Sequence, residues 1–295
     1  MRAVVVVALL LMDACGNSHQ AAVPDDTLMR RDAHAADLAL SLERPNEAIE
    51  HYKQALDRAR ARDDATAIGD YGYDIAVAQL MANEPRQALD TIRTTRAELA
   101  LRGAASFPTL DLAEATACYR VGDKATSDML AAHVEASADP AAAARASFLR
   151  GLIADDTGNM AGLNQAIDRL AGARSPDQQA DRDELLARRD LRLGAFASAA
   201  EEAEHSAELR RQELDYRDMA RVLAVAADAE AHAGRTDLAA ALYMRAGQSA
   251  AAQNDAEAAR AWLHRAMELG SDALLYKQAQ SAIEALGHEH PTAGR

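Results

Sequence analysis

Residues 47–56 read EAIEHYKQAL, and within this stretch Ala48, Tyr52 and Ala55 are separated by four and three positions. That spacing places the three side chains on one face of an α-helix. Ala36 lies twelve positions before Ala48, in the preceding apolar-periodic segment. Two helices can approach closely where both carry alanine at their crossing. The stretch therefore predicts the second helix of a closely packed pair.

The same arrangement occurs five more times along the chain. The small residues expected in the first helices are Ala36, Ala76, Ala113, Gly151, Ala187 and Ala227, and the triads of the second helices begin at Ala48, Ala88, Ala125, Leu163, Ala199 and Ala239. Successive triads are 40, 37, 38, 36 and 40 residues apart. A period near 38 residues, kept through six copies, indicates an array of helix pairs.

The small residue of the first helix and the Ala–aromatic–Ala triad of the second resemble the tetratricopeptide repeat family over roughly residues 26–270. The first and sixth copies match best, whereas Thr95, Leu163 and Leu170 replace small residues of the pattern. The resemblance implies an all-α fold, a right-handed α-solenoid of about six helix hairpins plus C-terminal capping helices. The residues expected to fill the space toward the next repeat are Tyr52, Ile92, Met129 and Tyr243.

Composition and proline placement agree with an all-helical chain. Hydrophobic residues make up 49% of the 295 residues but aromatic residues only 4%, and alanine, a strong helix former, supplies much of the apolar content. Five prolines stand where one periodic segment ends and the next begins: Pro45, Pro85, Pro108, Pro140 and Pro176. Proline suits the first turn of a helix and disrupts its interior. Residues 272–286 are expected to form a capping helix.

The N-terminus has the pattern of an exported protein. Arg2 precedes ten apolar residues, Ala3–Met12, which suit a signal peptide and are too few to span a membrane. Ala14 followed by Cys15 resembles the processing site of bacterial lipoproteins, where the cysteine is lipidated, although Asp13 is unusual there. The expected organisation is a signal peptide over 1–14, a tether over 15–25, the repeat array over 26–287 and a flexible tail over 288–295.

The resemblance to bacterial lipoproteins implies secretion across the inner membrane. It also implies that a lipid on Cys15 anchors the protein to a membrane, with the protein facing the periplasm. Gly16 after the cysteine favours the outer membrane, by the sorting rule of that family. A plain signal peptide with an incidental cysteine is the alternative. The net charge of −14 gives no attraction to phosphate backbones, so nucleic acid is not an expected partner.

Motifs that carry chemistry are missing from the sequence. It contains no GxSxG, HExxH, CxxC or P-loop pattern. The nine histidines are scattered, and His288-Glu289-His290 is interpreted as incidental rather than as a metal site. We therefore expect no catalytic residue, no metal site and no cofactor, and we expect that the protein is not an enzyme.

The resemblance implies a binding groove instead, because the first helix of each repeat lines the concave face in that family. The outward positions of those helices are Tyr73, Val77, Phe107, Leu110, Glu114, Arg145, Phe148, Leu152, Arg188, Arg192, Arg221 and Asp228. Aromatic and arginine side chains are common in binding hot spots. For Phe107, Leu110 and Phe148 the competing interpretation is ordinary packing between helices.

Together these features predict a non-catalytic protein-binding adaptor or scaffold of the bacterial cell envelope, which holds a partner peptide or subunit in its groove. The first alternative is a cytoplasmic regulatory or sensor module built on the same repeats, which requires that residues 1–14 are not a signal peptide. The second is an enzyme on a repeat scaffold, for which the sequence offers no motif. The sequence does not name the partner.

Overall fold

The structure is a computed structural model that describes residues 26–104 and 108–288; Cys15 and Phe107 lie outside these ranges. Within them the chain forms fourteen α-helices, one short 3-10 helix and no strand. The helices are α1 (Thr27–Ser41), α2 (Pro45–Ala61), α3 (Ala65–Met81), α4 (Pro85–Leu101), α5 (Pro108–Arg120), α6 (Lys124–Glu135), α7 (Pro140–Asp156), α8 (Met160–Arg169), the 3-10 helix η1 (Leu170–Gly172), α9 (Pro176–Leu193), α10 (Phe196–Gln212), α11 (Tyr216–His232), α12 (Thr236–Ala252), α13 (Ala256–Leu269) and α14 (Ala273–His288).

Helix boundaries follow local sequence signals. All five prolines predicted to open helices stand at the first residue of α2, α4, α5, α7 and α9. The turns after most helices contain a residue with positive φ. In the regular parts of the array these residues are twenty positions apart: Glu43, Asp63, Asn83 and Gly103, then Gly194, Leu214, Gly234 and Asn254. A left-handed residue just after a helix is a common way to satisfy its last carbonyl groups. The regular repeat is therefore two helix-turn units of twenty residues each.

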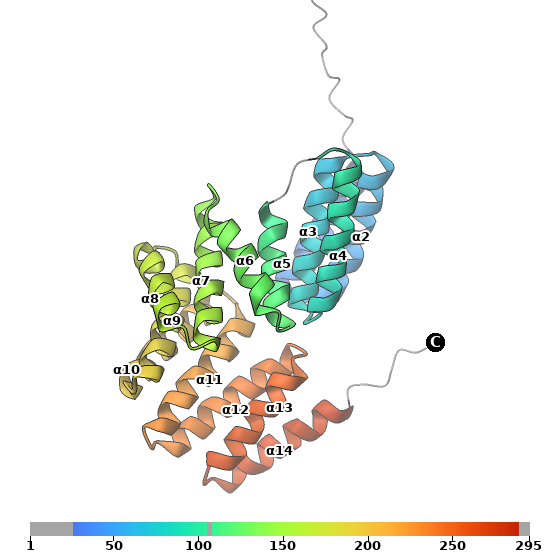
Figure 1. Ribbon diagram of the computed structural model, residues 1–295. Helices are drawn as coiled ribbons and strands as arrows, with labels where there is room; N and C mark the ends of the chain where they lie inside the picture. The colour runs from blue at the N-terminus through green and yellow to red at the C-terminus, as the bar shows by residue number, and fades with distance from the viewer. Residues whose placement is uncertain (1–25, 105–107, 289–295) are drawn as a thin grey trace, which may run out of the picture.

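The helices stack as an all-α solenoid that curves from α1–α4 through α5–α10 to α11–α14 (Figure 1). Each helix packs mainly on its neighbours in sequence. In addition, α3 contacts α5, α5 contacts α7, α7 contacts α9, and α9 contacts α11. Because these odd-numbered helices touch one another along the stack, they line its inner, shorter side. No described helix is long and apolar enough to span a membrane.

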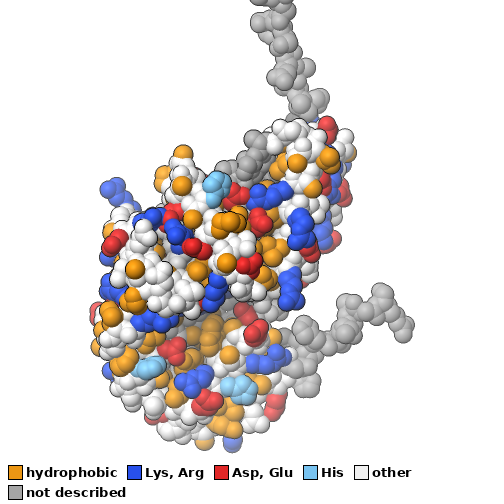
Figure 2. Space-filling model, viewed as in Figure 1, with side chains coloured by type: hydrophobic (Ala, Val, Ile, Leu, Met, Phe, Trp, Pro, Cys, Tyr) orange, Lys and Arg blue, Asp and Glu red, His pale blue; other side chains and the backbone are white. Residues whose placement is uncertain are grey.

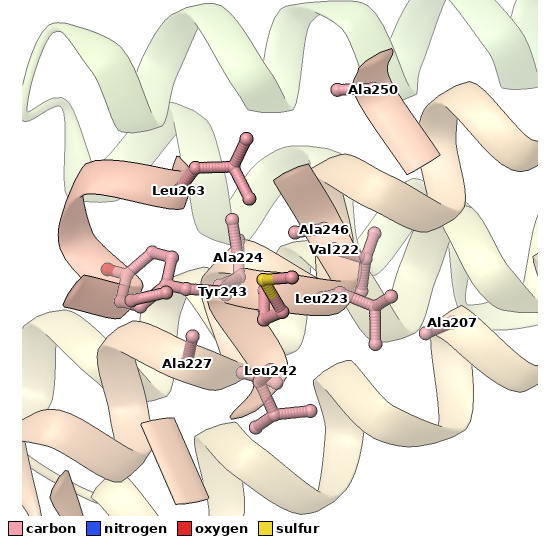
Figure 3. Packing of buried hydrophobic residues seen from close by; sticks show 14 of the residues in the cluster. Ala207, Val222, Leu223, Ala224, Ala227, Leu242, Tyr243, Ala246, Ala250 and Leu263 are labelled. Atoms are coloured by element: carbon pink, nitrogen blue, oxygen red, sulfur yellow. The ribbon is translucent and has the colours of Figure 1, made fainter. Parts of the chain in front are cut away.

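Alanine forms much of the interior, as predicted. Ala48, Ala76 and Ala239 have no exposed surface, and Tyr52 and Tyr243 are each only 3% exposed. The Tyr52 hydroxyl donates a hydrogen bond to Oδ1 of Asp37 at 2.6 Å. The largest cluster joins α11, α12 and α13, where Tyr243 lies among aliphatic and alanine side chains (Figure 3). Both tyrosines therefore act as packing residues between helices.

The predicted alignment of the third repeat is wrong. Met129 is 64% exposed, whereas Ser127, Ala131 and Val134 are buried. These three residues have the same spacing of four and three positions as the predicted triad, two residues later in the chain. Ser127 also donates a buried hydrogen bond to the carbonyl oxygen of Ala115, twelve positions earlier. In an alanine-rich helix, the triad that begins at Ala125 and the triad that begins at Ser127 both fit the apolar spacing. The contact between Ser127 and α5 decides which of the two is buried.

The middle of the array is irregular because its second helices are short. Helix α6 has 12 residues and α8 has 10, whereas α2, α4, α10 and α12 each have 17. These shortened helices reduce the period predicted from the sequence below the regular forty residues. The last helix, α14, occurs where a capping helix was expected.

Candidate functional site

The inner face contains a cavity of about 430 Å³, where the N-terminal and C-terminal parts of the array approach each other. One wall is formed by the end of α3, with Val77, Leu80 and Met81, and by Thr116 and Arg120 of α5. The opposite wall is formed by the turn between α10 and α11 and by the turn between α12 and α13. Figure 2 shows the surface hollowed between the middle helices and the C-terminal helices, with hydrophobic side chains inside the hollow.

Arg217 at the start of α11 joins the two sides of this cavity. Its Nη2 atom donates to the carbonyl oxygen of Met81 at 3.1 Å, and its Nη1 atom lies 3.3 Å from Oδ1 of Asn83. The same guanidinium also contacts the turn after α12, through the carbonyl oxygen of Gln253 at 3.2 Å and Oδ2 of Asp255 at 3.3 Å. Arg217 therefore connects the second repeat to the end of the sixth, although they are far apart in sequence.

The apolar residues predicted for the groove lie mostly in the interior. Leu110 has no exposed surface, and Phe148 and Leu152 are each 3% exposed. They pack between helices, which is the alternative that the sequence left open for Leu110 and Phe148. Val77 is half-buried and lines the cavity, and Tyr73 is half-buried on the same helix. Phe107 lies outside the described residues.

The arginines predicted for the groove lie on the inner helices, and each of them is paired with a carboxylate. Glu184 on α9 has no exposed side-chain surface and accepts hydrogen bonds from Arg221 at 2.7 Å and Arg188 at 2.9 Å. Arg188 also contacts Asp155 of α7 at 3.0 Å, and Arg192 pairs with the same carboxylate. These contacts connect α7, α9 and α11 across the inner face.

A second part of this network surrounds Phe148. Arg145 contacts Asp181 at 2.6 Å and Asp218 at 3.1 Å, and the buried Arg210 of α10 also pairs with Asp181. The guanidinium carbons of Arg145, Arg210 and Arg221 lie 5.1, 5.6 and 5.6 Å from the centre of the Phe148 ring. Such distances allow cation–π attraction. Phe148 is therefore positioned to support the arginines rather than to contact a ligand directly.

We call these groups the arginine–carboxylate network. Its five guanidiniums are Arg145, Arg188, Arg192, Arg210 and Arg221, and its five carboxylates are Asp155, Asp181, Glu184, Asp215 and Asp218. Burial opposes the ionisation of Glu184, but Arg221 and Arg188 outweigh it and hold the pKa of this carboxyl below its usual value. The network is balanced in formal charge, and it fixes the geometry of the inner face in repeats four to six.

Arg120, which sequence reasoning missed, differs from these arginines. Its Nη1 atom donates to the carbonyl oxygen of Leu80 at 2.6 Å, and no carboxylate among the described residues lies within 4.0 Å of it. Burial and the positive charges of Arg217 and Arg221 lower the pKa of Arg120 to about 10, and the negative charges of Asp218 and Asp255 oppose this shift. Its position in the last turn of a first helix carries no sequence signal, because the partner carbonyl is forty residues away.

Three carboxylates of the first two repeats lie near one another, Asp37 of α1 and Asp70 and Asp74 of α3. Burial, with the charges of Asp37 and Asp70, raises the pKa of Asp74 to about 6. Glu114, a predicted groove residue, accepts a hydrogen bond from Arg96 at 2.7 Å. Asp228, a predicted groove residue on α11 in the sixth repeat, accepts a hydrogen bond from the hydroxyl of Tyr243. The described residues contain no group of three or more side chains placed to hold a metal ion.

No protein-family model and no curated protein matches this chain. Among solved structures, the chain is similar to a signal transduction ATPase with numerous domains from Pyrococcus horikoshii that carries a tetratricopeptide repeat sensor. The TM-score is 0.52 at 13% sequence identity, over 88% of this chain and 44% of that protein. A tetratricopeptide repeat protein from Parabacteroides merdae matches with a TM-score of 0.48 at 14% identity, over 88% of this chain and all of that one. The first similarity supports the tetratricopeptide-type solenoid fold, and at this identity it supports the fold alone.

Proposed function

We propose that the protein is a non-catalytic adaptor that binds a segment of a partner protein along the inner face of its helical array. One observation carries this proposal: the inner face holds a cavity of about 430 Å³ that is lined by apolar side chains and by charged side chains of both signs. Cavities of this size that combine apolar walls with a few placed polar groups are typical binding sites.

The arrangement favours binding over chemistry. The charged groups of repeats four to six are engaged with one another across α7, α9 and α11, which holds them in place. A surface organised in this way supplies shape and hydrogen-bonding groups to a ligand.

A photo-crosslinking experiment tests the adaptor proposal. Benzoylphenylalanine replaces Met81, which is 41% exposed at the cavity, or Leu101, which is 86% exposed at the end of the outer helix α4. The protein is irradiated in cells of its source, and adducts are identified by mass spectrometry. We expect a discrete adduct from position 81 and none from position 101. Equal adducts at both positions, or none at either, would contradict the proposal.

We further propose that the adaptor works in the bacterial envelope, secreted across the inner membrane and anchored by a lipid on Cys15. The support is the signal-like stretch Ala3–Met12 followed by Ala14-Cys15-Gly16. Labelled palmitate is expected to attach to the wild-type protein and not to a Cys15→Ser variant, and globomycin is expected to cause the precursor to accumulate. Equal labelling of both proteins would contradict the proposed lipid anchor at Cys15.

A cytoplasmic regulatory or sensor role is the alternative, and a fusion of residues 1–30 to alkaline phosphatase separates the two. Phosphatase activity requires export, so an active fusion supports the envelope proposal. An inactive fusion favours the cytoplasmic alternative.

A further inference from the structure

Three carboxylates of the first two repeats have no basic partner. The charges of Asp37 on α1 and Asp70 on α3 both act on Asp74 of α3, and no lysine or arginine among the described residues lies within 4.0 Å of any of the three. In the arginine–carboxylate network, by contrast, five carboxylates pair with five guanidiniums. The N-terminal part of the array therefore offers negative charge to a ligand, whereas the arginine–carboxylate network does not.

The surroundings of these carboxylates favour a cation among them. Asp37 accepts a hydrogen bond from the hydroxyl of Tyr52 at 2.6 Å, which orients its carboxylate. Asp74 is half-buried, and burial together with the charges of Asp37 and Asp70 raises its pKa to about 6. A positive charge placed among the three would be attracted by each of them and would reduce their mutual repulsion.

The open side of α3 leads from these carboxylates into the cavity. Asp70, Asp74, Val77 and Met81 follow one another at intervals of four, three and four residues, so they lie along one face of the helix. All four keep exposed surface, and Val77 and Met81 line the cavity. The rise of an α-helix places Asp74 and Met81 about 10 Å apart along this face, which is the length of about three residues of an extended segment.

The cavity end of this face suits an apolar group rather than a charged one. Four carboxylates and three arginines line the cavity, so its charges nearly cancel. The side chains of Met81 and Leu214 are 41% and 62% exposed there, and exposed side chains of this size provide contacts for apolar groups of a ligand. A segment that follows the open side of α3 therefore meets apolar surface at one end and negative charge at the other.

We propose that the open side of α3 binds a basic segment of the partner protein. A lysine or arginine of this segment lies among Asp37, Asp70 and Asp74, and an apolar side chain about three residues away packs on Met81. Charge complementarity of this kind guides association and fixes the orientation of the partner. This inference rests on the proposed function, because it names the chemistry of the segment that the inner face receives.

The test is a selection of a displayed random peptide library on the full chain, at about 0.15 M salt to screen attraction to the acidic protein as a whole. The proteins are wild type, the double variant Asp70→Asn with Asp74→Asn, and the control Asp168→Asn, which removes an exposed carboxylate from the outer helix α8. We expect wild type and Asp168→Asn to enrich peptides with a lysine or arginine about three residues from an apolar residue, and the double variant to lose this enrichment.

Two outcomes would overturn the basic segment but leave the adaptor proposal standing: enrichment of peptides without a basic residue, or equal enrichment of basic peptides by the double variant. Enrichment of no peptide at all contradicts both proposals.

Binding of the best peptide is then measured by fluorescence anisotropy, with its basic residue intact or changed to glutamine. For wild type, the glutamine peptide is expected to raise Kd about 10-fold, and Asp74→Asn is expected to raise Kd of the basic peptide about 5-fold. On the glutamine peptide, Asp74→Asn should have little further effect. Additive losses would show that Asp74 and the basic residue do not meet. Because Asp74→Asn is expected to stabilise the fold, weaker binding by this variant cannot result from unfolding.

Discussion

The Nη2 atom of Arg217 lies 3.1 Å from the carbonyl oxygen of Met81, a residue 136 positions earlier in the chain. Through this contact and the one to Asn83, a single side chain connects the start of α11 to the turn after α3. The two segments are not neighbours in the stack of helices. They can meet only because the whole array curves, so this contact depends on that curvature.

Replacing Arg217 with alanine is expected to let the two sides of the cavity separate. The measurement is small-angle X-ray scattering, in which the variant should have a larger radius of gyration than wild type. The loss in the free energy of unfolding should be modest, about 1–2 kcal/mol, because the side chain makes only a few hydrogen bonds. The exposed Arg93→Ala is the control, and an unchanged scattering curve for Arg217→Ala would show that local packing alone sets the curvature.

Gly72 and Thr95 test the close approach of α3 and α4. A Cβ atom on Gly72 would lie 2.2 Å from Oγ1 of Thr95, so Gly72→Ala is expected to destabilise the protein by about 1–3 kcal/mol. Thr95→Ala removes the two nearest of the clashing atoms, Oγ1 and Cγ2, so the double variant should be more stable than Gly72→Ala alone. The check is chemical denaturation of all four proteins. If the stability losses of the two single variants add up in the double variant, the two side chains do not contact each other.

The alignment of the third repeat predicts different effects for two apolar residues of α6. Val134 is 1% exposed and Met129 is 64% exposed. Val134→Ala should lower the free energy of unfolding by about 1–2.5 kcal/mol, and Met129→Ala should change it by less than about 0.5 kcal/mol. A larger loss of stability from Met129→Ala than from Val134→Ala, measured by denaturation, would support the alignment that begins at Ala125 instead.

Asp74 is expected to lower stability at neutral and alkaline pH. Its pKa of about 6 in the folded protein exceeds the usual 3.8, so folding opposes its ionisation. The resulting penalty is absent at pH values well below 3.8, grows as the pH rises from 3.8 to about 6, and is fully present above that. Asp74→Asn should therefore stabilise the protein by about 1 kcal/mol at pH 8, after allowance for partial exposure, and much less at pH 4. An equal gain at both pH values would exclude ionisation as the cause.

Glu184 should show the opposite dependence on pH. Its folded pKa is depressed below 4.5, so it contributes stability that is present above that value and is lost as the pH falls further. Glu184→Gln leaves Arg188 and Arg221 facing each other and should cost about 3 kcal/mol at pH 7. Arg221→Gln should cost less, because Glu184 keeps Arg188 at 2.9 Å. The difference between wild type and Glu184→Gln should shrink below pH 4, as measured by urea denaturation at several pH values.

The fold could be predicted from the sequence because its determinants are local and repeated. The spacing of Ala48, Tyr52 and Ala55 follows from the geometry of one helix, and each proline marks a helix start within its own segment. The alignment of the third repeat could not be predicted in this way. Two sets of residues in α6 share the same spacing, and only the contact between Ser127 and Ala115 distinguishes them.

The candidate site depended on tertiary structure to a much greater degree. The sequence identified the inner helices and several of their arginines, but it could not tell that Phe148 is buried beneath guanidiniums or that Glu184 has two partners. Arg120 and Arg217 were not predicted, since their significance depends on residues 40 and more than 130 positions away. The sequence by itself determined a stack of helix pairs, because helix formation and alanine packing depend on neighbouring residues. Only the curvature of that stack decided which charges meet across the inner face.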